Sequence, residues 1–112
     1  MNEKYNGWAN YETWLTNLWL TEWHLTAADA LTDEEIFEAA QAVTEYDYMR
    51  ICGRLCERLK DWVDDYAEQC NVNLDRCGLL SDLCGAALAR VNWYEIADNW
   101  LSDLVSSYLF LT

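Results

Sequence analysis

The sequence contains no proline, only four glycines and a single histidine among its 112 residues. Folds built from many short strands need turn residues at frequent intervals, so this shortage disfavours a β-sandwich and favours helices. The apolar runs are short and interrupted by charges, which predicts that no segment spans a membrane. The first residues do not form a basic stretch followed by an apolar one, so we expect no secretory signal and a cytoplasmic location.

Basic residues are also scarce, with 7 Lys and Arg against 20 Asp and Glu, a formal net charge of −13. Such an excess disfavours direct binding to nucleic acid or anionic lipid, because like charges repel. It favours a basic partner or adaptation to very high salt. Hydrophobic residues make up 53% of the chain. That share supports a folded core, in contrast to a disordered acidic chain.

Residues that carry chemistry are few. The five cysteines, an odd number in a chain without a visible signal, are expected to be reduced thiols. Their positions are Cys52, Cys56, Cys70, Cys77 and Cys84. These spacings suit helical core positions and lack the close ligand pairs of a zinc site, and His24 is expected at the surface. No nucleophile elbow, phosphate-binding glycine loop, zinc-protease motif or calcium loop is present. We expect no catalysis, no cofactor and no metal.

Capping signals and apolar periodicity predict an all-α fold of about five helices in a single domain, residues 1–112. Asn10 is placed to cap the first helix, and Thr32 with Glu35 forms a capping box at the second. The third helix shows the clearest amphipathic pattern, with apolar residues opposite acidic ones. The predicted helices cover about residues 10–24, 32–43, 47–69, 75–90 and 92–108, with a short connector at 26–31.

Apolar stripes also predict which large side chains are buried. We expect four of the seven tryptophans in the core: Trp14, Trp19, Trp62 and Trp100. Trp8 and Trp23 are candidates for exposed anchors at an interface, where tryptophan is enriched. The fourth predicted helix carries the apolar stripe Leu79, Leu80, Leu83, Cys84, Ala87 and Leu88.

The acidic residues are concentrated in two base-free segments, with seven in residues 29–47 and five in residues 61–75. Arg50, Arg54 and Arg58 are expected to pair with Glu57 and Asp61 along the third helix. They would then neutralise its N-terminal half and leave its C-terminal half bare.

Acids on the third helix are spaced like the charges of a nucleic acid. Residues 57–68 span about 16 Å at the helical rise. Their five carboxylates give one charge per roughly 4 Å, against about 3.4 Å per phosphate of a DNA strand. The residues expected to contact a partner form two groups. The first is Asp61, Asp64, Asp65 and Glu68, and the second is Asp33, Glu34, Glu35 and Glu38.

Two segments near the ends of the chain carry a family resemblance. Residues 5–14 read YNGWANYETW and residues 91–97 read VNWYEIA. They resemble a family of small proteins of phages, plasmids and prokaryotic genomes, which carry an NGWxNYETW motif and an NWxEIA motif. The resemblance implies a mobile genetic element and supplies no catalytic residues. Both motifs have the form of helix starts with aromatic anchors, so we expect them to be structural.

By analogy with small acidic inhibitors from mobile elements, we expect an anti-defence protein, either anti-CRISPR or anti-restriction. It would act as a DNA mimic that binds the basic nucleic-acid groove of a host nuclease complex in the host cytoplasm, without contacting nucleic acid or membrane itself. Two alternatives remain open. One is a halophile-adapted acidic helical protein, and the other is a non-catalytic regulatory or assembly module of a mobile element.

Overall fold

A computed structural model describes residues 4–42, 44–70 and 78–111, with side chains to residue 107. This part of the chain contains six α-helices and no strand beyond an isolated bridge between Tyr5 and Trp8. The helices are α1 (Tyr11–Glu22), α2 (Ala27–Ala30), α3 (Asp33–Ala40), α4 (Glu45–Gln69), α5 (Leu79–Ala89) and α6 (Trp93–Leu111). The predicted all-α class is therefore confirmed, with six helices in place of about five.

Side-chain caps explain where the helices begin. Asn10 accepts a hydrogen bond from the Thr13 N–H at the start of α1, and Thr32 and Glu35 form the predicted capping box of α3. The additional helix α2 forms in the expected connector, because the Asp29 carboxylate accepts hydrogen bonds from the N–H and hydroxyl of Thr26. The predicted start of the fourth helix, near residue 75, lies outside the described residues.

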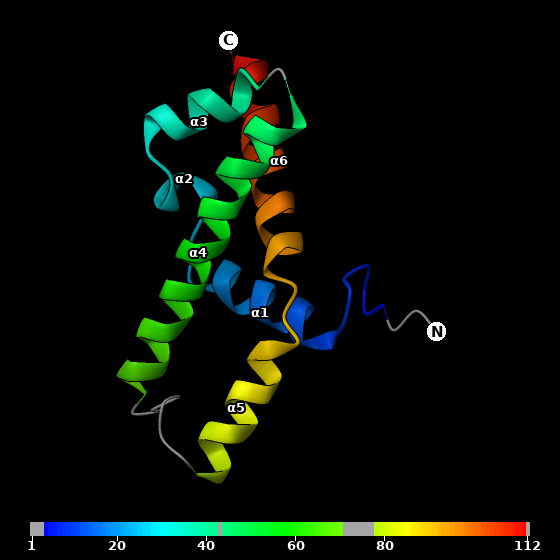
Figure 1. The fold of residues 1–112 in the computed structure, drawn as a ribbon, viewed down its shortest axis with the longest axis vertical. Coiled ribbons are helices and arrows are strands. Elements are labelled where there is room, and N and C mark those ends of the chain that lie inside the picture. Colours follow the sequence, from blue (N-terminus) through cyan, green and yellow to red (C-terminus); the bar gives the residue numbers. More distant parts are fainter. Residues whose placement is uncertain (1–3, 43, 71–77, 112) are drawn as a thin grey trace.

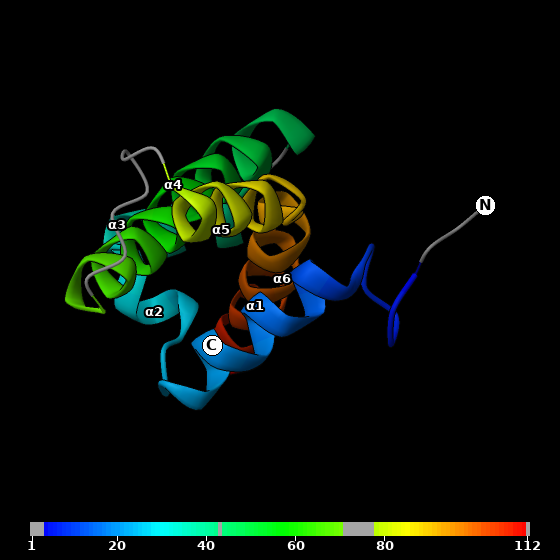
Figure 2. The same cartoon turned by 90° about the horizontal axis from the view of Figure 1, so that it is seen from below.

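The core lies between α4 and α6, which run side by side in opposite directions (Figure 1). The amphipathic face predicted for the third helix is confirmed, since Ile51, Leu55 and Leu59 are fully buried. Ile96 and Leu101 of α6 are buried against them. α2 and α3 contact both long helices, and α6 lies between α4 and α1 (Figure 2). No helix in the described residues is both long and apolar enough to cross a bilayer.

The two terminal motifs are hydrogen-bonded to each other although about 80 residues separate them. The Ala9 N–H donates to Glu95 Oε1 (2.9 Å), and Asn10 Nδ2 donates to the Arg90 carbonyl (2.7 Å). The Arg90 guanidinium also pairs with Glu12 at 3.1 Å. These contacts join the start of α1 to the start of α6.

Thr13 is the centre of this junction and is completely buried. Its hydroxyl donates to Asn10 Oδ1 (2.7 Å) and accepts from the Asn92 N–H (2.8 Å). A buried hydroxyl that satisfies two partners in this way needs threonine or serine at that position. The polar residues of both motifs therefore hold the fold together.

The tryptophans do not all follow the predicted pattern. Trp62 and Trp100 are half-buried and pack against the core, as expected, but Trp19 is 52% exposed. α1 buries Thr13 and Leu20, which lie seven residues apart on one face, and the side chain of Trp19 projects about 100° away from that face.

The other aromatic residues of the N-terminal region also depart from expectation. Trp14 packs in an aromatic cluster with Tyr5, at 5.0 Å between ring centroids, and with Tyr11. The two candidates for exposed anchors, Trp8 and Trp23, are half-buried and pack against the core.

Helix α5 contributes no buried residue. Leu79 and Leu80 are 74% and 73% exposed, so the described part of the chain does not cover the start of the predicted apolar stripe, whereas Leu88 near the end of the helix packs against the core. The four described cysteines, Cys52, Cys56, Cys70 and Cys84, are free thiols, and Cys77 lies outside the described residues.

Candidate functional site

The C-terminal half of α4 carries the first predicted group of acids at the surface. Asp61, Asp64, Asp65 and Glu68 are all exposed, as expected for side chains opposite the apolar face of the helix. None of them forms an ion pair or hydrogen bond with another described residue. Their carboxylates are therefore available to a partner.

The second predicted group is divided by the structure. Asp33 and Glu34 are exposed in the first turn of α3. Glu35 is only 5% exposed and pairs with Arg58 at 2.6 Å and Arg54 at 3.0 Å. The expectation that Glu35 contacts a partner is therefore wrong, because its oxygens are already occupied inside the protein.

The arginines of α4 do not pair along their own helix. The expectation that they pair with Glu57 and Asp61 is therefore wrong. They reach across to α3, where Arg50 contacts Glu38 at 2.6 Å while Arg54 and Arg58 share Glu35. Arg58 also donates to the Ala30 carbonyl at 2.8 Å. Spacing within a helix could not show that this face of α4 packs beside α3.

This cross-helix pairing leaves Glu57 without a partner among the described residues. It joins the other exposed acids in a continuous set that we call the acidic row, and one base, Lys60, is exposed within the same stretch. The members of the acidic row are Glu57, Asp61, Asp64, Asp65 and Glu68. The acidic row thus includes Glu57, which was expected to pair with an arginine of the same helix.

Glu35 is ionised and structural. The hydrogen bond from Arg58 is the main reason that its pKa falls to about 2 from an ordinary 4.5, helped by the Thr32 N–H and Arg54. Burial opposes this effect by disfavouring the charged form. The ion pairs therefore fix α3 against α4 and orient the surface on which Asp33 and Glu34 lie.

Two titratable groups near the core, Tyr48 and Cys52, are held in their neutral forms. Burial and a hydrogen bond to Asp98 (2.9 Å) raise the pKa of Tyr48. A hydrogen bond with Cys56, together with burial, raises the pKa of the Cys52 thiol. Cys52 is thus unlike a reactive cysteine, which needs a lowered pKa and access to solvent. Among the described residues, no group of three or more His, Cys, Asp or Glu side chains is placed to hold a metal ion.

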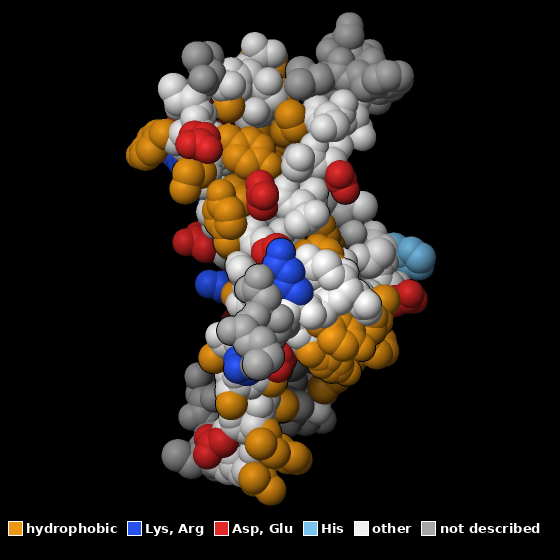
Figure 3. Space-filling view, turned by 90° about the vertical axis from the view of Figure 1, so that its right-hand side faces the viewer, with side chains coloured by type: hydrophobic (Ala, Val, Ile, Leu, Met, Phe, Trp, Pro, Cys, Tyr) orange, Lys and Arg blue, Asp and Glu red, His pale blue; other side chains and the backbone are white. Residues whose placement is uncertain are grey.

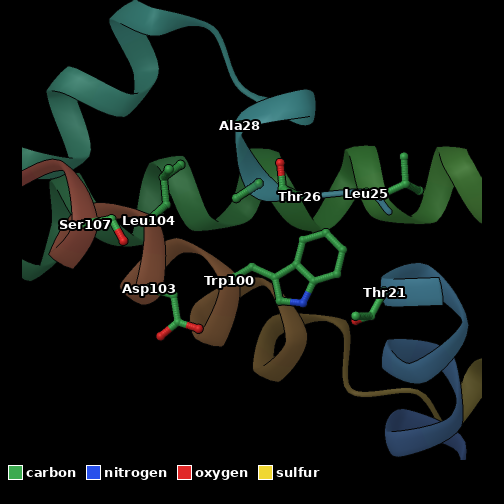
Figure 4. A pocket seen from close by; sticks show the side chains of 9 residues that line it. Thr21, Leu25, Thr26, Ala28, Trp100, Asp103, Leu104 and Ser107 are labelled. Carbon is green, nitrogen blue, oxygen red and sulfur yellow. The ribbon is translucent and has the colours of Figure 1, made fainter. Parts of the chain in front are cut away.

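An open pocket of about 310 Å³ was not indicated by the sequence. Figure 4 shows it between the end of α1, the start of α2 and the middle of α6. On α6, Trp100 and Asp103 are three residues apart and so lie on one face, which sequence periodicity could have shown. The opposite wall comes from residues 21–28, and only the tertiary fold brings it there.

The face of the molecule shown in Figure 3 does not carry a continuous row of acids. Acidic side chains are scattered singly among apolar ones, and apolar side chains gather at the lower end, where α5 begins. Leu79, Leu80 and Leu83 of α5 are all more than half exposed. The molecule therefore combines an acidic row with a separate apolar projection.

These features define a small all-helical protein with an exposed row of acidic side chains. The chain belongs to DUF7249, a family of unknown function, whose model matches residues 1–103. The match includes both hydrogen-bonded terminal motifs and all of the acidic row. No curated protein and no solved structure matches the chain.

Proposed function

We propose that this protein is an anti-defence inhibitor, of the anti-CRISPR or anti-restriction class, that binds the basic nucleic-acid groove of a host nuclease complex. It acts in the host cytoplasm by occupying the groove as a DNA mimic. The observation that carries the proposal is the acidic row, whose five exposed carboxylates have no partner among the described residues.

The dimensions of α4 support this proposal. Its 25 residues give a rod of about 37 Å at the helical rise, close to one turn of B-DNA at about 34–36 Å. The acidic row spans about 16 Å of this rod, with a charge spacing near that of one DNA strand. Burial of Ile51, Leu55 and Leu59 packs α4 against the core, so the helix backbone that carries the acidic row is ordered before binding.

The carboxylates of the acidic row must bind a partner together, because no single one of them contributes enough binding energy. A single exposed ion pair contributes little, because solvent screens it and two long side chains lose freedom. A row of acids that meets a row of bases gains specificity and a faster association rate, while like charges placed against each other are strongly unfavourable. Charge reversal at several positions is therefore the informative change.

The test compares two triple variants with equal changes in net charge. One converts Asp61, Asp64 and Glu68 to lysine within the acidic row. The matched control converts Glu22, Glu45 and Asp82 to lysine, which are exposed acids outside the acidic row, at the end of α1, at the first residue of α4 and in the first turn of α5. Circular dichroism first establishes that both variants are folded. Each is then added to a purified restriction endonuclease and a purified RNA-guided nuclease complex, and DNA binding and DNA cleavage are measured.

We expect the wild type and the control to block DNA binding by at least one of these enzymes, and the acidic-row variant to lose this activity. Inhibition should also weaken as salt is raised, since salt screens exposed charges. The proposal is contradicted if no enzyme is inhibited, or if the acidic-row variant inhibits as well as the control.

The exposed face of α5 favours a second candidate function, that of an assembly module of a mobile element. A helix that is apolar on most of its circumference is normally covered, and Leu79 and Leu80 are about three-quarters exposed. Conversion of both leucines to serine should abolish co-purification with an element-encoded protein if this function is correct, while inhibition of nucleases stays unchanged.

A further inference from the structure

The pocket between α1, α2 and α6 has walls of several chemical types. The indole of Trp100 forms one wall and is fixed in orientation, because its Nε1–H donates to Asn17 Oδ1 at 2.7 Å. Leu25 and Leu104 supply aliphatic surface, and Asp103 lies one helical turn beyond Trp100 (Figure 4). An ordered aromatic ring and a carboxylate thus line the same pocket.

Charge in the pocket has one sign. Among the described residues that line it, Asp103 is the one charged side chain, and no lysine, arginine or histidine contributes. Asp103 forms no hydrogen bond or ion pair with another described residue. The Thr21 hydroxyl donates to the Asn17 carbonyl (2.8 Å), which leaves its oxygen free to accept a further hydrogen bond. The Ser107 hydroxyl is a further potential acceptor in the wall. The pocket therefore offers acceptors and a negative charge to a ligand.

The wall formed by the α1–α2 turn is held firmly. The His24 N–H donates to the Thr21 carbonyl (2.9 Å), and the Leu25 N–H donates to the Leu20 carbonyl (3.3 Å). These two bonds form a Schellman motif, and His24 takes the left-handed conformation (φ 60°) that the motif requires. Leu25 and Thr26 are thereby set opposite α6. The pocket is thus present before any ligand binds.

We propose that this pocket binds the side chain of an arginine from a partner protein. The planar guanidinium would stack on the Trp100 indole, where a cation is attracted to the face of the ring. Its N–H groups would donate to the Asp103 carboxylate and to a hydroxyl, and its aliphatic stem would pack on Leu25 and Leu104. The volume, about 310 Å³, is at the lower end of the range for ligand sites, which suits one side chain.

Arginine fits this site better than lysine. Guanidinium is flat, is weakly hydrated and presents several donors in a fixed fork, whereas an ammonium group is compact and strongly hydrated. A pocket lined by an aromatic plane, a carboxylate and hydroxyls matches the flat guanidinium group with its several donors. Arginine is also enriched among the residues that dominate the energy of protein interfaces.

The arginine pocket and the proposed function both require a partner with basic side chains. They do not depend on each other in any other way. The pocket lies on α1, α2 and α6, whereas the acidic row lies on α4. A test with a single amino-acid derivative requires no nuclease. A pocket that does not bind arginine would therefore leave the proposal for the acidic row intact. An acidic row that does not inhibit nucleases would likewise leave the proposal for the pocket intact.

The experiment titrates the ¹⁵N-labelled full chain with N-acetyl-arginine methylamide and follows the indole Nε1–H signal of Trp100 by NMR. The corresponding citrulline derivative is the neutral control, since it has nearly the same shape without the charge. Asp103→Asn is compared with Asp82→Asn, which removes the same charge from an exposed acid of α5, outside both the pocket and the acidic row. Both positions are at the surface, so both variants are expected to fold.

We expect the arginine derivative to shift the Trp100 signal and to bind more tightly than the citrulline derivative. Asp103→Asn should weaken its binding about two- to fivefold, the range of an exposed ion pair, and Asp82→Asn should leave it unchanged. The proposal is overturned by equal binding of the two derivatives, by equal effects of the two variants, or by an unshifted Trp100 signal. Tighter binding of the matching lysine derivative would overturn the assignment to arginine.

Discussion

Replacement of Glu35 by glutamine tests whether the ion pairs between α3 and α4 stabilise the fold. The carboxylate accepts hydrogen bonds from Arg54, Arg58 and the Thr32 N–H, and its side chain is 6% exposed. Glutamine has almost the same shape but presents an amide N–H₂ to one of the two arginines. The substitution therefore removes a charge and one acceptor, with little change in packing.

The expected loss follows from the pKa of Glu35. Folding lowers this pKa from 4.5 to about 2, and a difference of this size corresponds to about 3 kcal/mol of stability. Arg54 and Arg58 are 47% and 36% exposed, so solvent screens part of this interaction. We expect Glu35→Gln to lower the free energy of unfolding by about 2 kcal/mol at pH 7.

The assay is urea unfolding followed by circular dichroism between pH 7 and pH 2. Because folding lowers the pKa, the stabilisation is complete above about pH 4.5 and is lost as the pH falls towards 2. The difference in the free energy of unfolding between wild type and Glu35→Gln should therefore also be complete above about pH 4.5 and shrink as the pH falls towards 2. Glu38→Gln is the control, because its pair with Arg50 is exposed and should matter little. A difference of equal size at pH 2 and pH 7 would refute the reasoning, since it would point to packing instead of charge.

Two further predictions concern the junction and the core. Thr13→Val should lower the free energy of unfolding by about 1–3 kcal/mol, because it removes the buried hydroxyl that accepts from the Asn92 N–H; a stability equal to wild type in urea unfolding would contradict the assigned hydrogen bond. Leu55→Ala should cost about 2–5 kcal/mol, whereas Leu83→Ala on α5 should change stability by less than about 0.5 kcal/mol. Equal losses from the two leucine substitutions would show that α5 is packed against the core.

Helix starts and the main core were predictable because their causes are local. Asn10, Thr32 and the apolar period of residues 47–69 act within one or two helical turns, and the structure places caps and buried residues as they indicate. The connector at 26–31 is short enough for one helical turn, and it forms the four-residue helix α2. Its Thr26–Asp29 cap follows the same chemistry as the other caps.

The partners of the arginines and the exposure of α5 were not predictable, because they depend on residues distant in sequence. Arg58 contacts Glu35, 23 positions earlier, and not the acids near it on α4. Leu79 and Leu83 follow an apolar pattern like that of any buried helix, and no local signal shows that the described helices leave them uncovered. The pocket was missed for the same reason, since Thr21 and Asp103 meet only in the folded protein.

The late position of α6 in the chain has a consequence for synthesis on the ribosome. This helix contacts α1, α2, α3 and α4 and supplies Ile96, Ala97 and Leu101 to the core. Translation adds about 5–20 residues per second, so the roughly 30 residues between the end of α4 and these side chains take about 1–6 s. During that interval the apolar faces of four helices have no α6 to pack against. The nascent protein therefore depends on its acidic charge to resist aggregation until α6 emerges and the core closes.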